Sequence, residues 1–186
     1  MKESGIPESQ IIGSGTQLDT ARLRSLIASE CGVSSKNVHA YIFGEHGDSS
    51  FIPWSIAHVA GVQVDEYYKT YSKNKDIAFD ADRIITDVRK SGGVVIANKG
   101  ATFYAIAVSV VKICRMVLAS ENSAATISTM LHGEYGIKDV CLSISCLIGP
   151  GGVEKRIVLP LTEEEIGKLQ ASAATLRKML DDIYAE

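Results

Sequence analysis

The 186-residue chain lacks several features that would point to other classes of protein. Its net charge of -3 leaves no basic excess for binding nucleic acid or an anionic membrane. The longest apolar run, residues 101–119, contains Lys112 and Arg115, which predicts a buried amphipathic helix and not a membrane span. Residues 1–4, MKES, have no apolar core of a signal peptide. We therefore expect no nucleic-acid partner, no membrane partner and a cytoplasmic location.

The four cysteines and four histidines lack the spacings of redox and metal sites. There is no CxxC, and three cysteines have apolar neighbours, so we expect reduced thiols in a core. There is no HxxxH or HExxH either, and we expect no bound metal. A metal site made by His46 and Asp48 stays open as a weak alternative, which a zinc or manganese titration without binding would remove.

The pattern of apolar residues predicts an α+β fold, in which long helices pack on antiparallel sheet and hairpins, as one domain over residues 1–186. We expect the helix at 102–118 to be the most apolar and central. We expect Val95 and Ile96 to face inward on the helix at 80–98, and Gly92-Gly93 to weaken or kink it. The predicted helices span residues 19–30, 80–98, 102–118 and a final segment from Thr162, where Glu165 completes a capping box.

Strand patterns predict a meander near the C-terminal end of the chain. Residues 140–148 alternate between an apolar row and a second row that includes two serines, and a glycine-rich turn leads to a return strand. Residues 65–75, rich in Tyr and Lys, are expected to be exposed and mobile. The predicted strands are 38–43, 49–53, 125–131, 140–148 and 154–159.

The hexapeptide GEHGDS at residues 44–49 places His46 between two glycines. Glycines let the backbone turn sharply, so the imidazole can face a cleft instead of packed neighbours. Because an ordinary imidazole pKa lies near 6.5, His46 is a candidate proton donor or acceptor. A solvated hairpin histidine is the alternative interpretation.

One predicted helix carries three charged residues that could serve two sites. Asp19 and Arg22 are three residues apart and share a face, whereas Arg24 points to nearly the opposite face. A solvated surface ion pair is the commoner outcome of such spacing.

Two motifs in this order, GSGTQLDTARLR at residues 13–24 and GEHGDS at residues 44–49, resemble the C-terminal, substrate-binding half of L-lactate dehydrogenases. The resemblance extends over essentially the whole chain and includes KGATFYAIA and HGEYGIKDV. It implies the α+β fold of the lactate/malate dehydrogenase C-terminal domain. It also implies a cytoplasmic, NAD-dependent oxidoreductase of glycolysis and fermentation that interconverts pyruvate and L-lactate as a homo-tetramer.

The resemblance assigns roles to six residues of this sequence. His46 matches the catalytic histidine, which protonates the keto oxygen of pyruvate as a hydride arrives from NADH. Asp19 matches the carboxylate bonded to its other nitrogen, and Arg22 matches the arginine that holds the substrate carboxylate. Thr102 matches a threonine of the substrate pocket. Arg24 and His39 match the pair that binds fructose 1,6-bisphosphate between subunits in allosteric bacterial members.

The chain departs from the family by having no GxGxxG after a strand, because the candidates near residues 13–15 and 149–151 lack the third glycine. The Rossmann domain that binds most of the NAD is therefore expected to be absent. We expect a domain fragment or truncated gene product, inactive by itself, with no cofactor-binding residues beyond edge contacts. Because it would expose apolar surface, we expect at least a dimer, strengthened by phosphate or sulfate.

Two other functions stay open. Malate dehydrogenases of the lactate-dehydrogenase-like type share the Asp–Arg helix and the histidine. Their histidine turn resembles GGHGD, with glycine where this chain has Glu45, and they tend to carry Ser-Ala in place of Ala101-Thr102. Lactate is therefore favoured. A non-catalytic module that only makes oligomer contacts is the second alternative.

Overall fold

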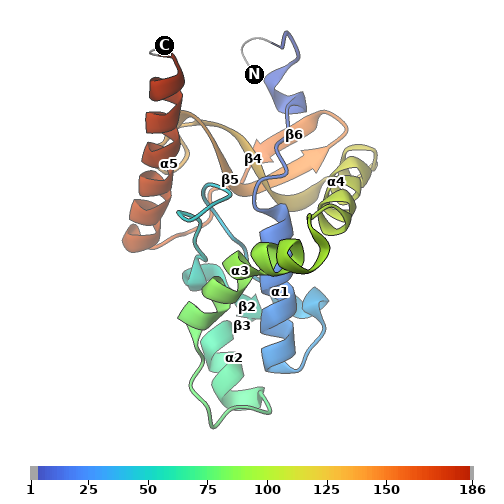
Figure 1. Ribbon diagram of the computed structural model, residues 1–186, viewed down its shortest axis with the longest axis vertical. Coiled ribbons are helices and arrows are strands. Elements are labelled where there is room, and N and C mark those ends of the chain that lie inside the picture. Colours follow the sequence, from blue (N-terminus) through green and yellow to red (C-terminus); the bar gives the residue numbers. More distant parts are fainter. Residues whose placement is uncertain (1–3, 185–186) are drawn as a thin grey trace.

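The elements of the chain form two packed groups, as a computed structural model describes for residues 4–184 (Figure 1). The expectation for residues 1–4 therefore falls largely outside the described residues. The helices are α1 (Gln17–Cys31), α2 (Val64–Tyr71), α3 (Ala81–Lys99), α4 (Tyr104–Val117) and α5 (Glu163–Tyr184). The strands are β1 (Val38–His39), β2 (His58–Val59), β3 (Val62–Gln63), β4 (Ser123–His132), β5 (Lys138–Gly149) and β6 (Gly152–Arg156). Short 3₁₀ helices lie at Glu8–Gln10, Ser35–Asn37, Trp54–Ile56 and Glu134–Gly136.

Each group has its own hydrophobic core. The first core joins the β4–β5–β6 meander to α5, at the top of Figure 1. The second joins α1, α2 and α3 to the small antiparallel sheet β1–β2–β3, in the lower part of the figure. The segment that carries His46 connects the two, because Phe43 belongs to the first core and Ile42 to the second.

The predicted meander is confirmed. β4 pairs antiparallel with β5 from Ser123↔Ile148 to His132↔Lys138, and β5 pairs antiparallel with β6. The apolar row of β5 faces the core because successive side chains of a strand point to opposite faces. The buried members of that row are Val140, Leu142, Ile144, Cys146 and Ile148.

The predicted capping box at the start of α5 is also confirmed, and it does more than cap the helix. The Thr162 backbone N–H donates to Glu165 at 3.0 Å, and the Glu165 N–H donates to the Thr162 hydroxyl at 3.3 Å. The same Glu165 carboxylate accepts from the backbone N–H of Ser55 at 3.0 Å and from its hydroxyl at 2.5 Å. Glu165 therefore fastens α5 to the segment that follows the His46 turn.

One prediction about the first half of the chain was wrong. Residues 38–43 and 49–53 do not form a strand pair: only β1 pairs, with β2, and Phe43 and Phe51 meet in a single bridge. The pairing stops because Gly44 bonds to Ser143 of β5 instead. Residues 65–75 are mainly exposed, as expected, and most of them form α2, whose Tyr68 is buried in the second core.

The expectation for the most apolar helix was also wrong. α4 begins at Tyr104 and is not central, since Tyr104, Val108 and Leu118 are 72%, 70% and 85% exposed. Val95 and Ile96 of α3 are likewise exposed instead of inward, and α3 continues through the predicted weak point at Gly92-Gly93. Periodicity shows that a helix has an apolar face but not what covers that face.

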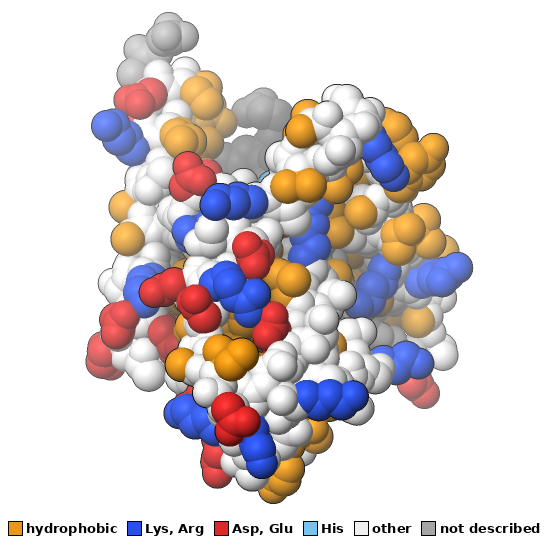
Figure 2. Space-filling model, turned by 60° about the horizontal axis from the view of Figure 1, so that its bottom comes forward, with side chains coloured by type: hydrophobic (Ala, Val, Ile, Leu, Met, Phe, Trp, Pro, Cys, Tyr) orange, Lys and Arg blue, Asp and Glu red, His pale blue; other side chains and the backbone are white. Residues whose placement is uncertain are grey.

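The surface is of mixed character elsewhere. Figure 2 shows acidic and basic side chains interspersed over the face in view, with hydrophobic side chains gathered at its upper right. No helix within residues 4–184 combines the length and apolarity needed to cross a membrane.

Replacing Glu165 by alanine should destabilise the chain by about 2 kcal/mol, because one buried carboxylate satisfies three donors from Ser55 and Thr162. Burial alone would raise the pKa of Glu165, but hydrogen bonds from Ser55 and Thr162 hold that pKa below its usual value. The stabilisation should therefore be complete above the ordinary carboxyl pKa and disappear as the pH falls through the depressed one. Urea unfolding from pH 7 to pH 3 measures it, with the exposed neighbour substitution Glu164→Ala as the control. An equal loss in both variants would contradict the assigned role of Glu165.

Candidate active site

His46 and Asp19, 27 residues apart in sequence, meet at one hydrogen bond. The distance from His46 Nδ1 to Asp19 Oδ2 is 2.7 Å. The Asp19 side chain is 13% exposed and the His46 side chain is 64% exposed, so the pair has one largely buried and one open partner. The hydrogen bond to Asp19 raises the pKa of His46 above its ordinary value, against the opposing effects of partial burial and of Arg22. The pair thus favours a protonated imidazole open to solvent.

Two buried threonines at the start of α1, Thr16 just before the helix and Thr20 in its first turn, hold Asp19 opposite the His46 turn. The Thr16 hydroxyl donates to the Ile42 carbonyl at 2.5 Å, and the Ile42 backbone N–H donates to the Thr20 hydroxyl at 3.0 Å. The backbone N–H and the carbonyl of Ile42 are therefore both hydrogen-bonded to residues at the start of α1. Sequence reasoning missed these two threonines, although both lie inside the motif GSGTQLDTARLR.

Arg22 shares the Asp19 carboxylate. Its Nη1 lies 3.1 Å from Asp19 Oδ1, whereas His46 is bound by the other oxygen. The side chain of Arg22 is 20% exposed, so much of the guanidinium is held in place by its surroundings. The predicted face shared by Asp19 and Arg22 is confirmed, and it is not a solvated surface pair.

One cavity of about 410 Å³ is lined by all four residues predicted for the main site, which are Asp19, Arg22, His46 and Thr102. His46 offers a titratable proton, Arg22 a planar cation and Thr102 a hydroxyl within this one space. Gly92 and Gly93 form part of its wall, and a Cβ added at either would meet nothing closer than Arg22 Nη1 at 3.9 Å from Gly92. Its lining consists of Leu18, Asp19, Arg22, His46, Gly47, Asp48, Ser50, Val88, Arg89, Gly92, Gly93, Ile96, Thr102 and Ile106.

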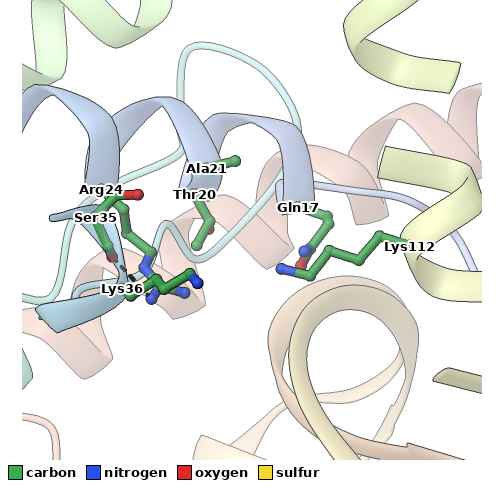
Figure 3. Close-up of a pocket in the computed structure, with 7 residues that line it drawn as sticks. All are labelled: Gln17, Thr20, Ala21, Arg24, Ser35, Lys36 and Lys112. Carbon is green, nitrogen blue, oxygen red and sulfur yellow. Dashed lines mark hydrogen bonds between the residues drawn. The ribbon is translucent and has the colours of Figure 1, made fainter. Parts of the chain in front are cut away.

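Arg24 lies on a different cavity, of about 210 Å³, which it lines together with Gln17, Thr20 and Ala21 of α1 (Figure 3). Lys36 and Lys112 line the same space, and no acidic residue does. Arg24 Nη2 donates to the Ser35 carbonyl at 3.1 Å, while its Nε is buried without a hydrogen-bond partner. Burial, together with the charge of Arg24, lowers the pKa of Lys112. This cationic cavity can accept an anion.

The structure does not bring His39 into the cationic cavity. Its side chain is exposed on β1, and the cations that accompany Arg24 are Lys36 and Lys112 instead. Figure 3 shows Lys112 extending from α4 toward Gln17 of α1. The sequence marks Lys112 only as a lysine within the most apolar run of the chain. Within residues 4–184, no group of three or more His, Cys, Asp or Glu side chains is arranged to hold a metal ion.

Comparison with known proteins identifies the family. Residues 16–186 match the family described as lactate/malate dehydrogenase, alpha/beta C-terminal domain. The chain is 43% identical over 183 residues to L-lactate dehydrogenase 1 of Clostridium acetobutylicum, and 41% identical over 183 residues to an L-lactate dehydrogenase of Treponema denticola. Each match covers 98% of this chain and 58% of the relative, so the chain spans little more than half the length of these proteins.

Solved structures agree with that assignment. An L-lactate dehydrogenase from Clostridium thermocellum superposes with a TM-score of 0.87 at 41% identity, over 98% of this chain and 59% of that one. A lactate dehydrogenase from a Medee basin deep-sea metagenome library gives a TM-score of 0.93 at 39% identity, over 98% and 58%. On the family match, the sequence identities and the superpositions together, the chain belongs to the lactate/malate dehydrogenase family through its alpha/beta C-terminal domain.

Proposed function

We propose that this chain is the substrate-binding and catalytic domain, over residues 1–186, of a cytoplasmic L-lactate dehydrogenase that interconverts pyruvate and L-lactate with NADH and NAD. The observation that carries the proposal is the Asp19–His46 hydrogen bond, which opens onto the same cavity as Arg22. The names of the relatives support the choice of reaction.

The three side chains divide the work on pyruvate. Arg22 offers a guanidinium that can form two parallel hydrogen bonds to the substrate carboxylate, which fixes the position of the keto group. His46 is bound to Asp19 through Nδ1, so its Nε2 is the nitrogen free to donate a proton to the keto oxygen. In the reverse direction, neutral His46 takes the proton from the lactate hydroxyl. Asp19 favours the protonated ring that the reduction consumes.

Both sheets of the described residues differ from the kind of sheet that binds dinucleotides. Dinucleotides bind at the carboxyl edge of a parallel sheet, whereas both sheets within residues 4–184 are antiparallel and three-stranded. The cofactor supplies the hydride in this reaction, and we therefore assign its binding mainly to residues outside this chain. The residues of the chain bind the carboxylate and move the proton.

Lactate is favoured over malate by two residues near the cavity. Thr102 places a methyl group and a hydroxyl in the lining. Glu45 precedes His46, at a position where the motif of the malate-type enzymes has glycine. Malate dehydrogenation remains the second candidate because the Asp19–Arg22–His46 arrangement would serve both reactions. A non-catalytic module is disfavoured, since it would have no need of a cavity that joins a cation to a raised-pKa imidazole.

The cationic cavity supports an allosteric role. A sugar bisphosphate such as fructose 1,6-bisphosphate would satisfy Arg24, whose Nε lacks a partner, together with Lys36 and Lys112. His39 would contribute from a neighbouring subunit. The exposed apolar faces of α3 and α4 support a homo-oligomer, at least a dimer for this chain and a tetramer for the whole enzyme.

The pKa of His46, measured by NMR titration of the 186-residue chain, should lie above the ordinary imidazole value near 6.5. Asp19→Asn should lower it, because the amide keeps a hydrogen-bonding group but removes the charge that favours imidazolium. Since a raised pKa keeps the ring charged to higher pH, pyruvate reduction should be constant below that pKa and fall as the pH rises through it. His46→Gln assigns the signal. A His46 pKa that is unchanged in Asp19→Asn would contradict the pairing.

A chimera should test the reaction itself. We expect pyruvate-dependent NADH oxidation when this chain is joined to the part of the Clostridium acetobutylicum relative that lies outside the matched region. His46→Gln should abolish it, and Asp19→Asn should reduce the rate by roughly two orders of magnitude, as in other carboxylate–histidine pairs. Oxaloacetate assayed in parallel decides between lactate and malate. A soluble, NADH-binding chimera that reduces neither acid would refute the proposed function.

The two arginines of α1 should separate in the same chimera. Arg22→Lys should raise the KM for pyruvate, because lysine cannot form two parallel hydrogen bonds to a carboxylate. Arg24→Ala and Lys112→Ala should leave the unactivated rate unchanged and remove any response to fructose 1,6-bisphosphate. Lys99→Ala, an exposed lysine outside both cavities, is the control. Equal effects of the Arg22 and Arg24 changes on pyruvate would contradict two separate sites.

A further inference from the structure

Helix α5 reaches the His46 turn through one buried serine. Ser172 is 0% exposed although it lies in the middle of a helix whose outer face is solvated. The Glu45 backbone N–H donates to its Oγ at 2.8 Å, and its Oγ lies 2.9 Å from the Oγ of Ser49. The contacts join residues 127 and 123 positions apart in sequence. Glu45 directly precedes His46, and Ser49 follows His46 by three residues.

The directions of these hydrogen bonds follow from the chemistry of the groups. The Ser49 hydroxyl donates to Glu45 Oε2 at 2.5 Å, because a carboxylate only accepts. Its single proton is therefore used, and Ser172 must be the donor between the two hydroxyls. Ser172 donates to Ser49, Ser49 donates to the Glu45 side chain, and the Glu45 backbone donates to Ser172. The three residues form a closed ring in which each hydroxyl both donates and accepts, an arrangement in which hydrogen bonds strengthen one another.

The two glycines beside His46 make this ring possible. A Cβ at Gly44 would lie 2.8 Å from Ser172 Oγ, and the φ of +98° at Gly44 is one that other residues rarely adopt. A Cβ at Gly47 would lie 2.5 Å from Glu45 Oε1, so the bare backbone lets the carboxylate fold back over the turn. The glycines thus admit α5 on one side and the Glu45 carboxylate on the other.

We propose that Ser172 is a positioning residue that holds His46 at Asp19 through the ring with Glu45 and Ser49. The His46 ring is 64% exposed, so packing does not fix it, and its placement depends on the backbone on either side. The ring of hydrogen bonds immobilises that backbone at Glu45 and Ser49. A turn released from α5 would lengthen the hydrogen bond from His46 to Asp19. The proposal rests on the proposed role of His46 as the proton donor.

The pKa of His46 in the 186-residue chain is the direct test. In Ser172→Ala the Glu45 N–H and the Ser49 hydroxyl lose their common partner, and we expect the His46 pKa to fall by about half a unit toward the ordinary value near 6.5. Ser49→Ala breaks the same ring of hydrogen bonds at a partly buried residue outside α5 and should give a similar fall, which keeps the test available if Ser172→Ala folds poorly. The charged groups around His46, all kept in these variants, are Asp19, Arg22, Glu45, Asp48 and Arg89.

Leu169→Ala is the matched control. Leu169 is also 0% exposed on α5, and its truncation removes packing while leaving the ring intact. We expect it to lower the stability of the chain without changing the His46 pKa. An unchanged His46 pKa in folded Ser172→Ala and Ser49→Ala would overturn the proposal, as would an equal fall in Leu169→Ala.

Kinetics of the chimera give a second readout. Ser172→Ala should lower kcat by about tenfold with little change in the KM for pyruvate, because the ring touches the His46 turn and not Arg22. A rise in KM with kcat unchanged would overturn the proposal. The NMR test needs no turnover, so an inactive chimera with the expected pKa pattern would refute the proposed function and leave the positioning role of Ser172 standing.

Discussion

Two threonine hydroxyls at the start of α1, one on Thr16 just before the helix and one on Thr20 in its first turn, hold the segment that leads to His46. Thr16 and Thr20 bind the carbonyl and the N–H of Ile42, and all three residues are buried. A backbone group left unpaired in the interior costs free energy comparable to a lost hydrogen bond, so this segment cannot shift along α1 without a penalty. The position of Asp19 relative to His46 follows from that register, since Asp19 lies between the two threonines on the helix.

Asp19 then links proton transfer to substrate binding. It gives one oxygen to His46 and the other to Arg22, so one partly buried carboxylate orients a titratable ring and a permanent cation. Arg22 opposes the protonation of His46 by its charge, yet the hydrogen bond to Asp19 outweighs it and the pKa of His46 stays raised. Removing the carboxylate would leave two groups that repel each other when the ring is charged. The pair and the arginine therefore act as a unit, and effects of single substitutions within it should not add.

The sequence predicted those parts of the molecule that local rules control. The meander follows from a period of two residues and the shared face of Asp19 and Arg22 from a period of 3.6. The capping box follows from a threonine and a glutamate three residues apart at the start of a helix. The errors arose where distant partners decide. Gly44 bonds to Ser143 and so ends the predicted hairpin, and nothing in residues 38–53 reveals a partner 99 positions away. Val95 and Ile96 of α3 and the apolar face of α4 were assigned to a core because their pattern is that of a buried helix.

The site shows the same limit. Asp19 and Arg22 were found because charge at helical spacing is visible in sequence, and His46 because it lies between two glycines. Thr16, Thr20 and Ser172 were missed because hydroxyls carry no such pattern. Their importance comes from burial against a backbone group of another element, which only the fold reveals. Lys112 is an intermediate case, since a lysine in an apolar helix indicates a special environment without naming Arg24 as its neighbour.

Helix α1 also joins the two cavities through one residue. Thr20 lines the cationic cavity beside Arg24, and its hydroxyl accepts from the backbone of Ile42 on the path to His46. A ligand in the cationic cavity can alter the His46 site only if α1 has two positions and the ligand prefers one of them. Because Thr20 and Ile42 are bonded, a displaced α1 would carry Ile42 with it, and the Asp19–His46 distance would change little. What can still vary is the orientation of the first turn of α1 relative to α5. Ser172 of α5 holds the other side of the His46 turn.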